Sequence, residues 1–125
     1  MNERILLVDD EEATLAVISD LLQVSGYRVE TSRTGHEALT AFTRDPSAFD
    51  LVISDLYMEQ MSGIALAESL LQARPGTPIV ILTGDKEQAL IEAQGLAIRG
   101  FVQKPVTVEQ LVDSIGRALS QPGAA

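Results

Sequence analysis

Five side chains that could bind a metal ion or a phosphoryl group each follow a short apolar run of the sequence. In chain order they are Asp9, Asp10, Asp55, Thr83 and Lys104. An ionised carboxylate is costly to desolvate without a partner, so an apolar run that stops on an acid calls for an explanation. Asp55 is the clearest case, because it follows the run Leu-Val-Ile-Ser.

The three acids would repel one another if the ends of their runs meet. Two like charges about 4 Å apart repel by roughly 4 kcal/mol at an effective dielectric of 20. A raised pKa, a bound cation or Lys104 would relieve this repulsion. Mg²⁺ fits such a site, because it takes a couple of carboxylates and keeps several waters, and Mn²⁺ accepts the same oxygen ligands. The simpler alternative is that Asp9 and Asp10 cap a following helix, where acids are favourable.

Thr83 and Lys104 are suited to hold a phosphoryl group, the first by a hydrogen bond and the second by its charge. Asp55 could then act as a carboxylate nucleophile that forms an aspartyl phosphate. Catalysis in such a site depends mainly on positioning and electrostatics. Taken singly, Thr83 would be an ordinary helix N-cap and Lys104 a surface lysine.

The elements that must position these residues alternate along the chain. Short apolar runs predict strands over residues 4–9, 50–54, 78–82 and 99–103, and alternation of apolar and polar residues predicts an edge strand over residues 27–31. Helical spacing predicts helices over residues 11–25, 34–44, 64–71, 86–94 and 108–119. Strict alternation predicts an α/β fold, a doubly wound five-stranded parallel sheet with helices on both faces. Sites in such sheets lie beyond the carboxyl ends of the strands, where the five side chains are expected.

Composition restricts the possible functions. The chain has 125 residues and a net charge of −9, which argues against binding of nucleic acid by this domain itself. It has no cysteine, no apolar run that approaches the roughly 20 residues of a membrane span, and no signal peptide, so we expect a cytoplasmic protein that does not enter a membrane. We expect one domain over residues 1–120 and a flexible tail over residues 121–125.

Four motifs together resemble the receiver domain of two-component response regulators. They are ILLVDDEE (5–12), FDLVISDLYM with MSG (49–63), PIVILTG (78–84) and GFVQKP (100–105). The resemblance covers essentially the whole chain. It implies the flavodoxin-like (βα)5 fold of the chemotaxis-regulator type, with strand order 2-1-3-4-5. Features between residues 41 and 75 also resemble receivers attached to hybrid sensor kinases.

The resemblance implies a role for each metal-site residue. Asp55 matches the phospho-accepting aspartate, while Asp9 and Asp10 match the acidic pair that binds Mg²⁺. Asp10 would be a direct ligand, Asp9 would act largely through water, and the backbone carbonyl of Tyr57 would be a further ligand. Glu59 departs from the family, which usually has proline there, so the loop after Asp55 carries an added negative charge.

Three further residues match the phosphoryl-binding and switch positions. Thr83 matches the switch hydroxyl and Lys104 the phosphate-binding lysine, with a cis bond to Pro105 implied. Phe101 matches the aromatic switch position, where a phenylalanine can signal only by ring packing. Tyr57 and Asp85 resemble positions that tune dephosphorylation.

The function implied is that of a signalling module, not a metabolic enzyme: it catalyses only its own phosphorylation and dephosphorylation. The donor phosphohistidine must come from a sensor histidine kinase or a phosphotransfer domain, because we interpret the single histidine, His36, as a surface residue on a helix far from the acids. We expect phosphorylation to shift the surface of residues 86–95, the last strand and residues 107–119. The sequence does not identify the downstream partner or output domain.

Three alternatives remain open. A haloacid dehalogenase-like Mg²⁺-dependent phosphatase would need a second acid in an Asp-x-Asp motif, but Asp55 is followed by Leu56-Tyr57. A flavodoxin-like binder of flavin phosphate would need a Gly/Ser/Thr-rich loop where residues 9–12 are acidic. A receiver that no longer accepts phosphate and acts by binding alone would not need all five site side chains.

Overall fold

A five-stranded parallel sheet, in the order β2-β1-β3-β4-β5, forms the centre of the computed structural model, which describes residues 2–121. The strands are β1 (Arg4–Val8), β2 (Arg28–Ser32), β3 (Leu51–Asp55), β4 (Ile79–Thr83) and β5 (Gly100–Gln103). The helices are α1 (Glu12–Val24), α2 (Gly35–Arg44), α3 (Gly63–Ala73), α4 (Lys86–Glu92) and α5 (Val108–Ser120). The predicted fold class and strand order are therefore confirmed, with β2 at an edge.

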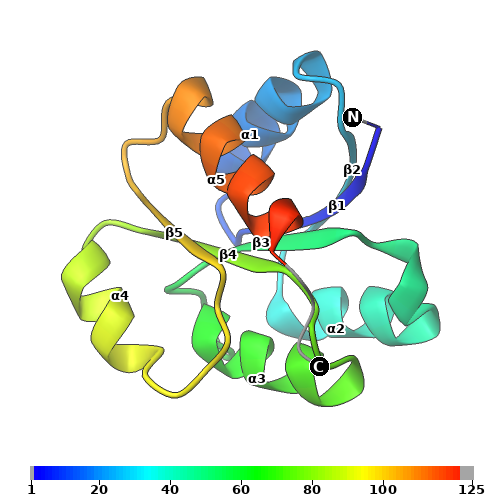
Figure 1. The fold of residues 1–125 in the computed structure, drawn as a ribbon, viewed down its shortest axis with the longest axis vertical. Coiled ribbons are helices and arrows are strands. Elements are labelled where there is room, and N and C mark those ends of the chain that lie inside the picture. The colour runs from blue at the N-terminus through cyan, green and yellow to red at the C-terminus, as the bar shows by residue number, and fades with distance from the viewer. Residues whose placement is uncertain (1, 122–125) are drawn as a thin grey trace.

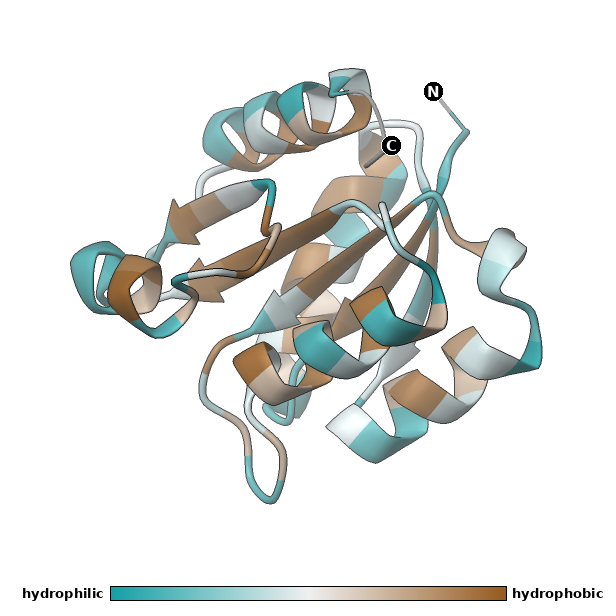
Figure 2. Ribbon diagram, turned by 60° about the horizontal axis from the view of Figure 1, so that its bottom comes forward, coloured by the Kyte–Doolittle hydropathy of each residue, from teal (hydrophilic) through white to brown (hydrophobic). Residues whose placement is uncertain are grey.

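Helices cover both faces of the sheet. Helices α1 and α5 lie on one face, and α2, α3 and α4 lie on the other (Figure 1). Alternate strand residues enter the two cores: Ile5 and Leu7 pack with α1 and α5, whereas Leu6 and Val8 pack on the opposite side. Strands β3 and β4 are buried along their whole length and β1 nearly so, and the strand residues in the middle of the sheet are mostly hydrophobic (Figure 2), which is why their sequences read as continuous apolar runs.

Strand boundaries differ from the predicted ones in a way that matters for the site. Strands β2, β3 and β4 each begin and end one residue later than the sequence indicated. The pairing of Asp55 with Leu82 and of Thr83 with Gln103 extends the ladder to these polar residues. Periodicity carries no information on hydrogen-bonded pairing between strands, so the predicted strands ended at Ser54 and Leu82, one residue short of the observed ends.

Helices α2, α4 and α5 begin where the sequence indicated, each after a capping side chain, whereas α3 (Gly63–Ala73) extends beyond its predicted range at both ends. The Thr34 side chain accepts a hydrogen bond from the Glu37 amide and begins α2, as expected. Helix α4 ends at Glu92, earlier than predicted, and a 3-10 helix at Pro46–Ala48, with Asp45 as its N-cap, was not predicted. Of the expected tail, residues 122–125 lie outside the described residues, while the Gln121 carbonyl accepts a hydrogen bond from Arg99 at 2.9 Å.

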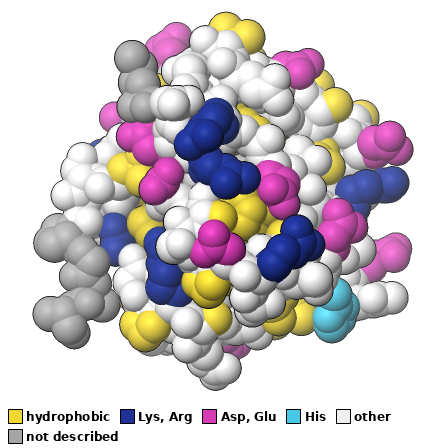
Figure 3. Space-filling model, turned by 90° about the vertical axis from the view of Figure 1, so that its right-hand side faces the viewer, with side chains coloured by type: hydrophobic (Ala, Val, Ile, Leu, Met, Phe, Trp, Pro, Cys, Tyr) yellow, Lys and Arg dark blue, Asp and Glu magenta, His cyan; other side chains and the backbone are white. Residues whose placement is uncertain are grey.

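The surface around β2 carries both signs of charge. Acidic and basic side chains alternate over the face seen in Figure 3, without a continuous basic patch. Two ion pairs lie at this edge of the sheet, Arg4 with Glu30 and Arg33 with Glu12, each at 3.7 Å. Within residues 2–121, no helix combines the length and the apolar character needed to cross a membrane.

Candidate functional site

Asp55 is the last residue of β3 and is held by an ion pair with Lys104. Its main chain pairs with Leu82 of β4, and 8% of the residue is exposed. The Lys104 ammonium nitrogen lies 2.7 Å from Asp55 Oδ1. Of the three ways to relieve the repulsion that the sequence left open, the ion pair with Lys104 is present in the structure.

Lys104 is positioned by the end of the sheet. Its amide donates a hydrogen bond to the Thr83 carbonyl at 2.7 Å, which extends the β4–β5 ladder by one residue. The Lys104–Pro105 peptide bond is cis, as the family resemblance implied.

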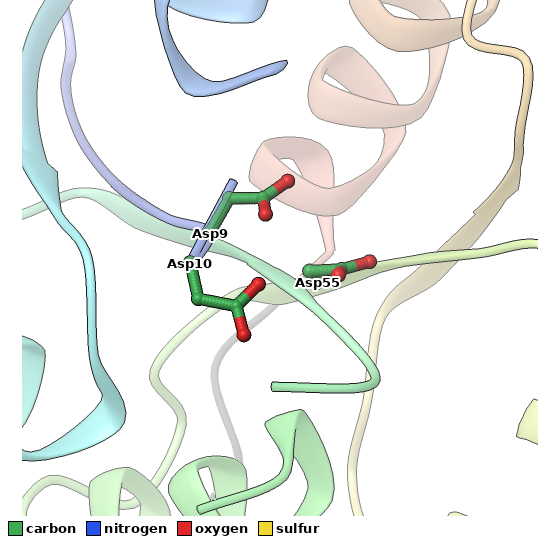
Figure 4. Close-up of side chains that lie close together, drawn as sticks. All are labelled: Asp9, Asp10 and Asp55. Carbon is green, nitrogen blue, oxygen red and sulfur yellow. The ribbon is translucent and has the colours of Figure 1, made fainter. Parts of the chain in front are cut away.

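Asp9 and Asp10 lie beside Asp55, directly after β1. One carboxylate oxygen from each of the three acids lies within 4.8 Å of the others, and the three side chains gather around a common space (Figure 4). Asp9 is 1% exposed, and its Oδ1 accepts a hydrogen bond from the Glu11 amide. Asp9 Oδ2 is buried and has no hydrogen-bond partner among the described residues. The helix-cap alternative does not hold, because Glu11 is the N-cap residue of α1 and no side chain caps this helix.

The pKa of Asp9 is raised above its ordinary value. Burial is the main cause, and the negative charges of Asp55 and Asp10 add to it. The Glu11 amide and the Lys104 ammonium oppose the shift without cancelling it. The site thus holds more negative charge than its own cation neutralises.

The residues present fit a hard divalent cation. Three carboxylates face one ammonium group, and the unpartnered Asp9 Oδ2 lies in the same cluster. Carboxylate oxygens are the ligands that Mg²⁺ prefers, and the chain lacks cysteine, so it offers no thiolate ligand. The cluster that the sequence predicted is present, and its chemistry favours Mg²⁺ over a softer metal.

Thr83 ends β4 and is 1% exposed. Its hydroxyl accepts a hydrogen bond from the Asp85 amide at 3.0 Å and lies 3.2 Å from the Asp85 carbonyl, to which it donates. Phe101 is half-buried and packs against the core under α2, α3 and α4. Thr83 and Phe101 thus lie on neighbouring strands, β4 and β5, with the Thr83 hydroxyl bonded to the start of α4.

The loop after Asp55 is fastened on two sides, by contacts that sequence reasoning missed. The Glu59 amide donates a hydrogen bond to Asp10 Oδ2 at 3.1 Å, a bond that the usual proline could not make. Tyr57 is 58% exposed, and its hydroxyl donates to Glu92 Oε2 of α4 at 2.8 Å. This hydrogen bond raises the pKa of the Tyr57 phenol. Glu92 is exposed and lies 35 residues from Tyr57 in the chain, so nothing in the sequence marked it as the partner of Tyr57.

Gly63 is a second residue whose role becomes visible only in the structure. A Cβ at this position would lie 2.3 Å from the Asp55 carbonyl oxygen, so only glycine lets the start of α3 approach the end of β3. The Gly63 amide also donates to the Leu56 carbonyl at 2.8 Å. A glycine at the first position of a helix was the available signal.

His36 lies on α2 and is exposed, as the sequence indicated. It is not a member of the acidic cluster of Asp9, Asp10 and Asp55.

Comparison with known proteins places this geometry in a family. Residues 5–116 match the model of the response regulator receiver domain. The two-component response regulator PprB of Pseudomonas aeruginosa is 37% identical over 121 residues, which are 94% of this chain and 44% of that protein. The transcriptional regulatory protein GlrR of Escherichia coli is also 37% identical, over 97% of this chain and 27% of its own length. The chain thus spans less than half the length of these two relatives.

Solved structures give the same result. A response regulator receiver domain protein from Clostridium thermocellum has a TM-score of 0.88 and 30% identity, with 94% of each chain covered. The chemotaxis protein CheY4 of Vibrio cholerae has a TM-score of 0.86 and 30% identity over 94% of this chain and 99% of that one. The receiver domain of the hybrid histidine kinase CckA, with a TM-score of 0.78 and 28% identity, covers 94% of this chain and 99% of its own.

Proposed function

Because the chain belongs to the response regulator receiver domain family, we propose that it is a phospho-accepting module in which Asp55 takes a phosphoryl group from a phosphohistidine. The observation that carries this proposal is the buried Asp55 carboxylate, paired with Lys104 at 2.7 Å and flanked by Asp9 and Asp10. The proteins that match this chain include response regulators and a chemotaxis protein, which are signalling proteins. The donor is a sensor histidine kinase or a phosphotransfer domain.

The transfer makes one bond and breaks one. An Asp55 carboxylate oxygen attacks the phosphorus, the P–N bond to the donor imidazole breaks, and its electron pair leaves with the imidazole nitrogen. Lys104 then exchanges its ion pair with the carboxylate for one with a phosphoryl oxygen. The Thr83 hydroxyl leaves the Asp85 main chain and donates to another phosphoryl oxygen. Hydrolysis of the aspartyl phosphate by water returns the module to its starting state.

Asp9, Asp10, Asp55 and the Tyr57 carbonyl are the residues that would hold Mg²⁺, or Mn²⁺ in its place. When bound, the divalent ion supplies positive charge that offsets the charge of the phosphoryl oxygens. Asp10 is kept in orientation by the Glu59 amide. Asp9, with one oxygen on the Glu11 amide and the other unpartnered, is suited to act through a metal-bound water.

We propose that phosphorylation changes the surface formed by α4, β5 and α5. The Thr83 hydroxyl has a single proton, so donating it to a phosphoryl oxygen ends its donation to the Asp85 carbonyl and loosens the contact of Thr83 with the start of α4. Phe101, half-buried on β5, can follow by repacking its ring. A downstream partner or an output domain would read the change; residues 1–120 act as the receiver domain, and this domain does not bind nucleic acid itself.

The test is phosphorylation by a small donor. We expect the wild-type chain, with Mg²⁺ and acetyl phosphate, to gain the mass of one phosphate, and Asp55→Asn to gain none. EDTA should abolish the gain in the wild type. Asp113→Asn, which removes an exposed acid of α5, is the matched control and should be labelled at the wild-type rate. Labelling of Asp55→Asn at the wild-type rate would contradict the assignment, and no labelling of the wild type would favour a receiver that acts by binding alone.

A further inference from the structure

Helix α4 is weakly anchored to the rest of the domain. It has seven residues, and Ala89 is the buried residue within its bounds. Its neighbours Leu90 and Ile91 are 50% and 64% exposed. A helix with little buried apolar surface has a low local stability, so individual hydrogen bonds at its ends contribute a large part of what holds it in place.

Both ends of α4 are hydrogen-bonded to residues of the proposed phosphorylation site. At the start, Asp85 caps the helix through the Gln88 amide, and its own amide donates to the Thr83 hydroxyl at 3.0 Å. At the end, Glu92 accepts the hydrogen bond from the Tyr57 hydroxyl at 2.8 Å. Tyr57 belongs to the loop that follows Asp55.

The two bonds respond differently to phosphorylation. Movement of the Thr83 hydroxyl to a phosphoryl oxygen weakens its bonds to Asp85 and so loosens the contact between β4 and the start of α4, which Asp85 still caps. The Tyr57–Glu92 bond does not involve Thr83, so it opposes displacement of the helix and is broken only when α4 moves away from the loop. An interaction made in one of two states stabilises that state relative to the other.

We propose that Glu92 is a positioning residue that, through the Tyr57 hydroxyl, holds α4 in the conformation of the unphosphorylated domain. This proposal rests on the proposed function for the identity of the second state. It assigns the restraint to one chemical group on each side: the phenol oxygen of Tyr57 and the carboxylate of Glu92. Loss of either should shift α4 toward its phosphorylated conformation without phosphate.

Two variants separate the restraint from general damage. Tyr57→Phe removes only the hydroxyl and keeps the ring and the backbone carbonyl, and Glu92→Ala removes the acceptor. Glu87→Ala, at another exposed acid of α4, is the matched control. In the unphosphorylated protein we expect amide hydrogen exchange over residues 86–92 to be about three- to tenfold faster in both variants, and no faster still in the double variant.

A second measurement tests the direction of the change. Amide NMR shifts of α4 in each unphosphorylated variant should lie on the line that joins the unphosphorylated and phosphorylated wild type. Exchange equal to that of Glu87→Ala would overturn the restraint, and shifts off that line would overturn the coupling to the phosphorylated state. A wild type that takes no phosphate would instead overturn the proposed function, and the exchange rates would still decide whether Glu92 restrains α4.

Discussion

At the scale of single residues, the acidic cluster lowers the stability of the metal-free fold and offers ligands to a divalent cation. Asp9 is buried with one unpartnered oxygen, and its pKa is raised by burial and by its acidic neighbours. A folded state that holds such a carboxylate is destabilised at neutral pH, because the unfolded chain would hydrate it freely. A divalent cation that binds only the folded state reverses this cost. The same residue is therefore unfavourable without metal and useful with it.

Asp9→Asn should stabilise the metal-free protein. Asparagine keeps an oxygen for the Glu11 amide and removes the charge. We expect the free energy of unfolding at neutral pH to rise on the order of 1 kcal/mol, since relieved repulsion is partly offset by lost attraction to Lys104. A raised acid pKa lowers stability as pH rises from the ordinary value of 3.8 through the raised one, so the advantage of Asn should be absent below 3.8 and grow above it.

Urea unfolding in EDTA over a pH series measures this difference. Asp20→Asn, which removes an exposed acid from α1, is the control for net charge. Equal effects of the two substitutions would show that the cluster is not strained. Added Mg²⁺ should raise the melting temperature of the wild type more than that of Asp9→Asn.

At the scale of elements, the site depends on how closely α3 approaches the end of β3. Gly63 begins α3 with its Cα against the Asp55 carbonyl, and its amide bonds to the Leu56 carbonyl. On the far side of the same loop, a Cβ at Gly35 of α2 would meet the Met61 side chain at 2.6 Å. Two helix starts therefore determine the path of the loop that carries Tyr57.

Gly63→Ala should destabilise the fold and displace Asp55. The added Cβ would meet a backbone oxygen at 2.3 Å, which cannot rotate away, and such overpacking costs about 2–3 kcal/mol. Gly116→Ala is the matched control, because no atom lies within 4 Å of a Cβ at that position of α5. Alanine there should stabilise the protein by about 0.5–1 kcal/mol. Denaturant unfolding of both variants checks the pair, and equal losses would contradict this account of Gly63.

At the scale of the whole molecule, acidity adds to the local repulsion. The chain carries 18 acidic residues against 9 basic ones. A net charge of −9 opposes the compact state through self-repulsion, although it favours solubility. Ion pairs such as Arg33 with Glu12, more than half exposed, offset little of this in water.

Monovalent salt should therefore stabilise the metal-free protein. An increase from about 0.05 M to about 0.5 M NaCl shortens the screening length to well below 10 Å and should raise the free energy of unfolding by about 1 kcal/mol. Thermal unfolding in EDTA measures the effect. Near the sequence pI of about 4.4 the net charge vanishes, so the increment should shrink there. If salt raised the free energy of unfolding as much near the pI as at neutral pH, screening of net charge would not be the cause.

Much of the fold and the composition of the acidic cluster followed from local sequence. Short apolar runs such as Ile5 to Val8 are typical of strands buried on both faces, and their alternation with amphipathic helices favours an open parallel sheet. Because the carboxyl ends of parallel strands meet at one edge of a sheet, Asp9, Asp55 and Lys104 were expected at the same edge. The strand order that makes β1 and β3 neighbours came from the family resemblance, and the sheet has that order.

Other features were decided only when the chain packed. The strands β3 and β4 reach Asp55 and Thr83 because hydrogen-bonded pairing, not hydrophobicity, sets their last residues. Gly63 approaches Asp55, and Tyr57 bonds to Glu92, only because separate elements of the chain pack against each other. Sequence periodicity records which face of an element is buried, whereas contacts between exposed polar groups leave no such record.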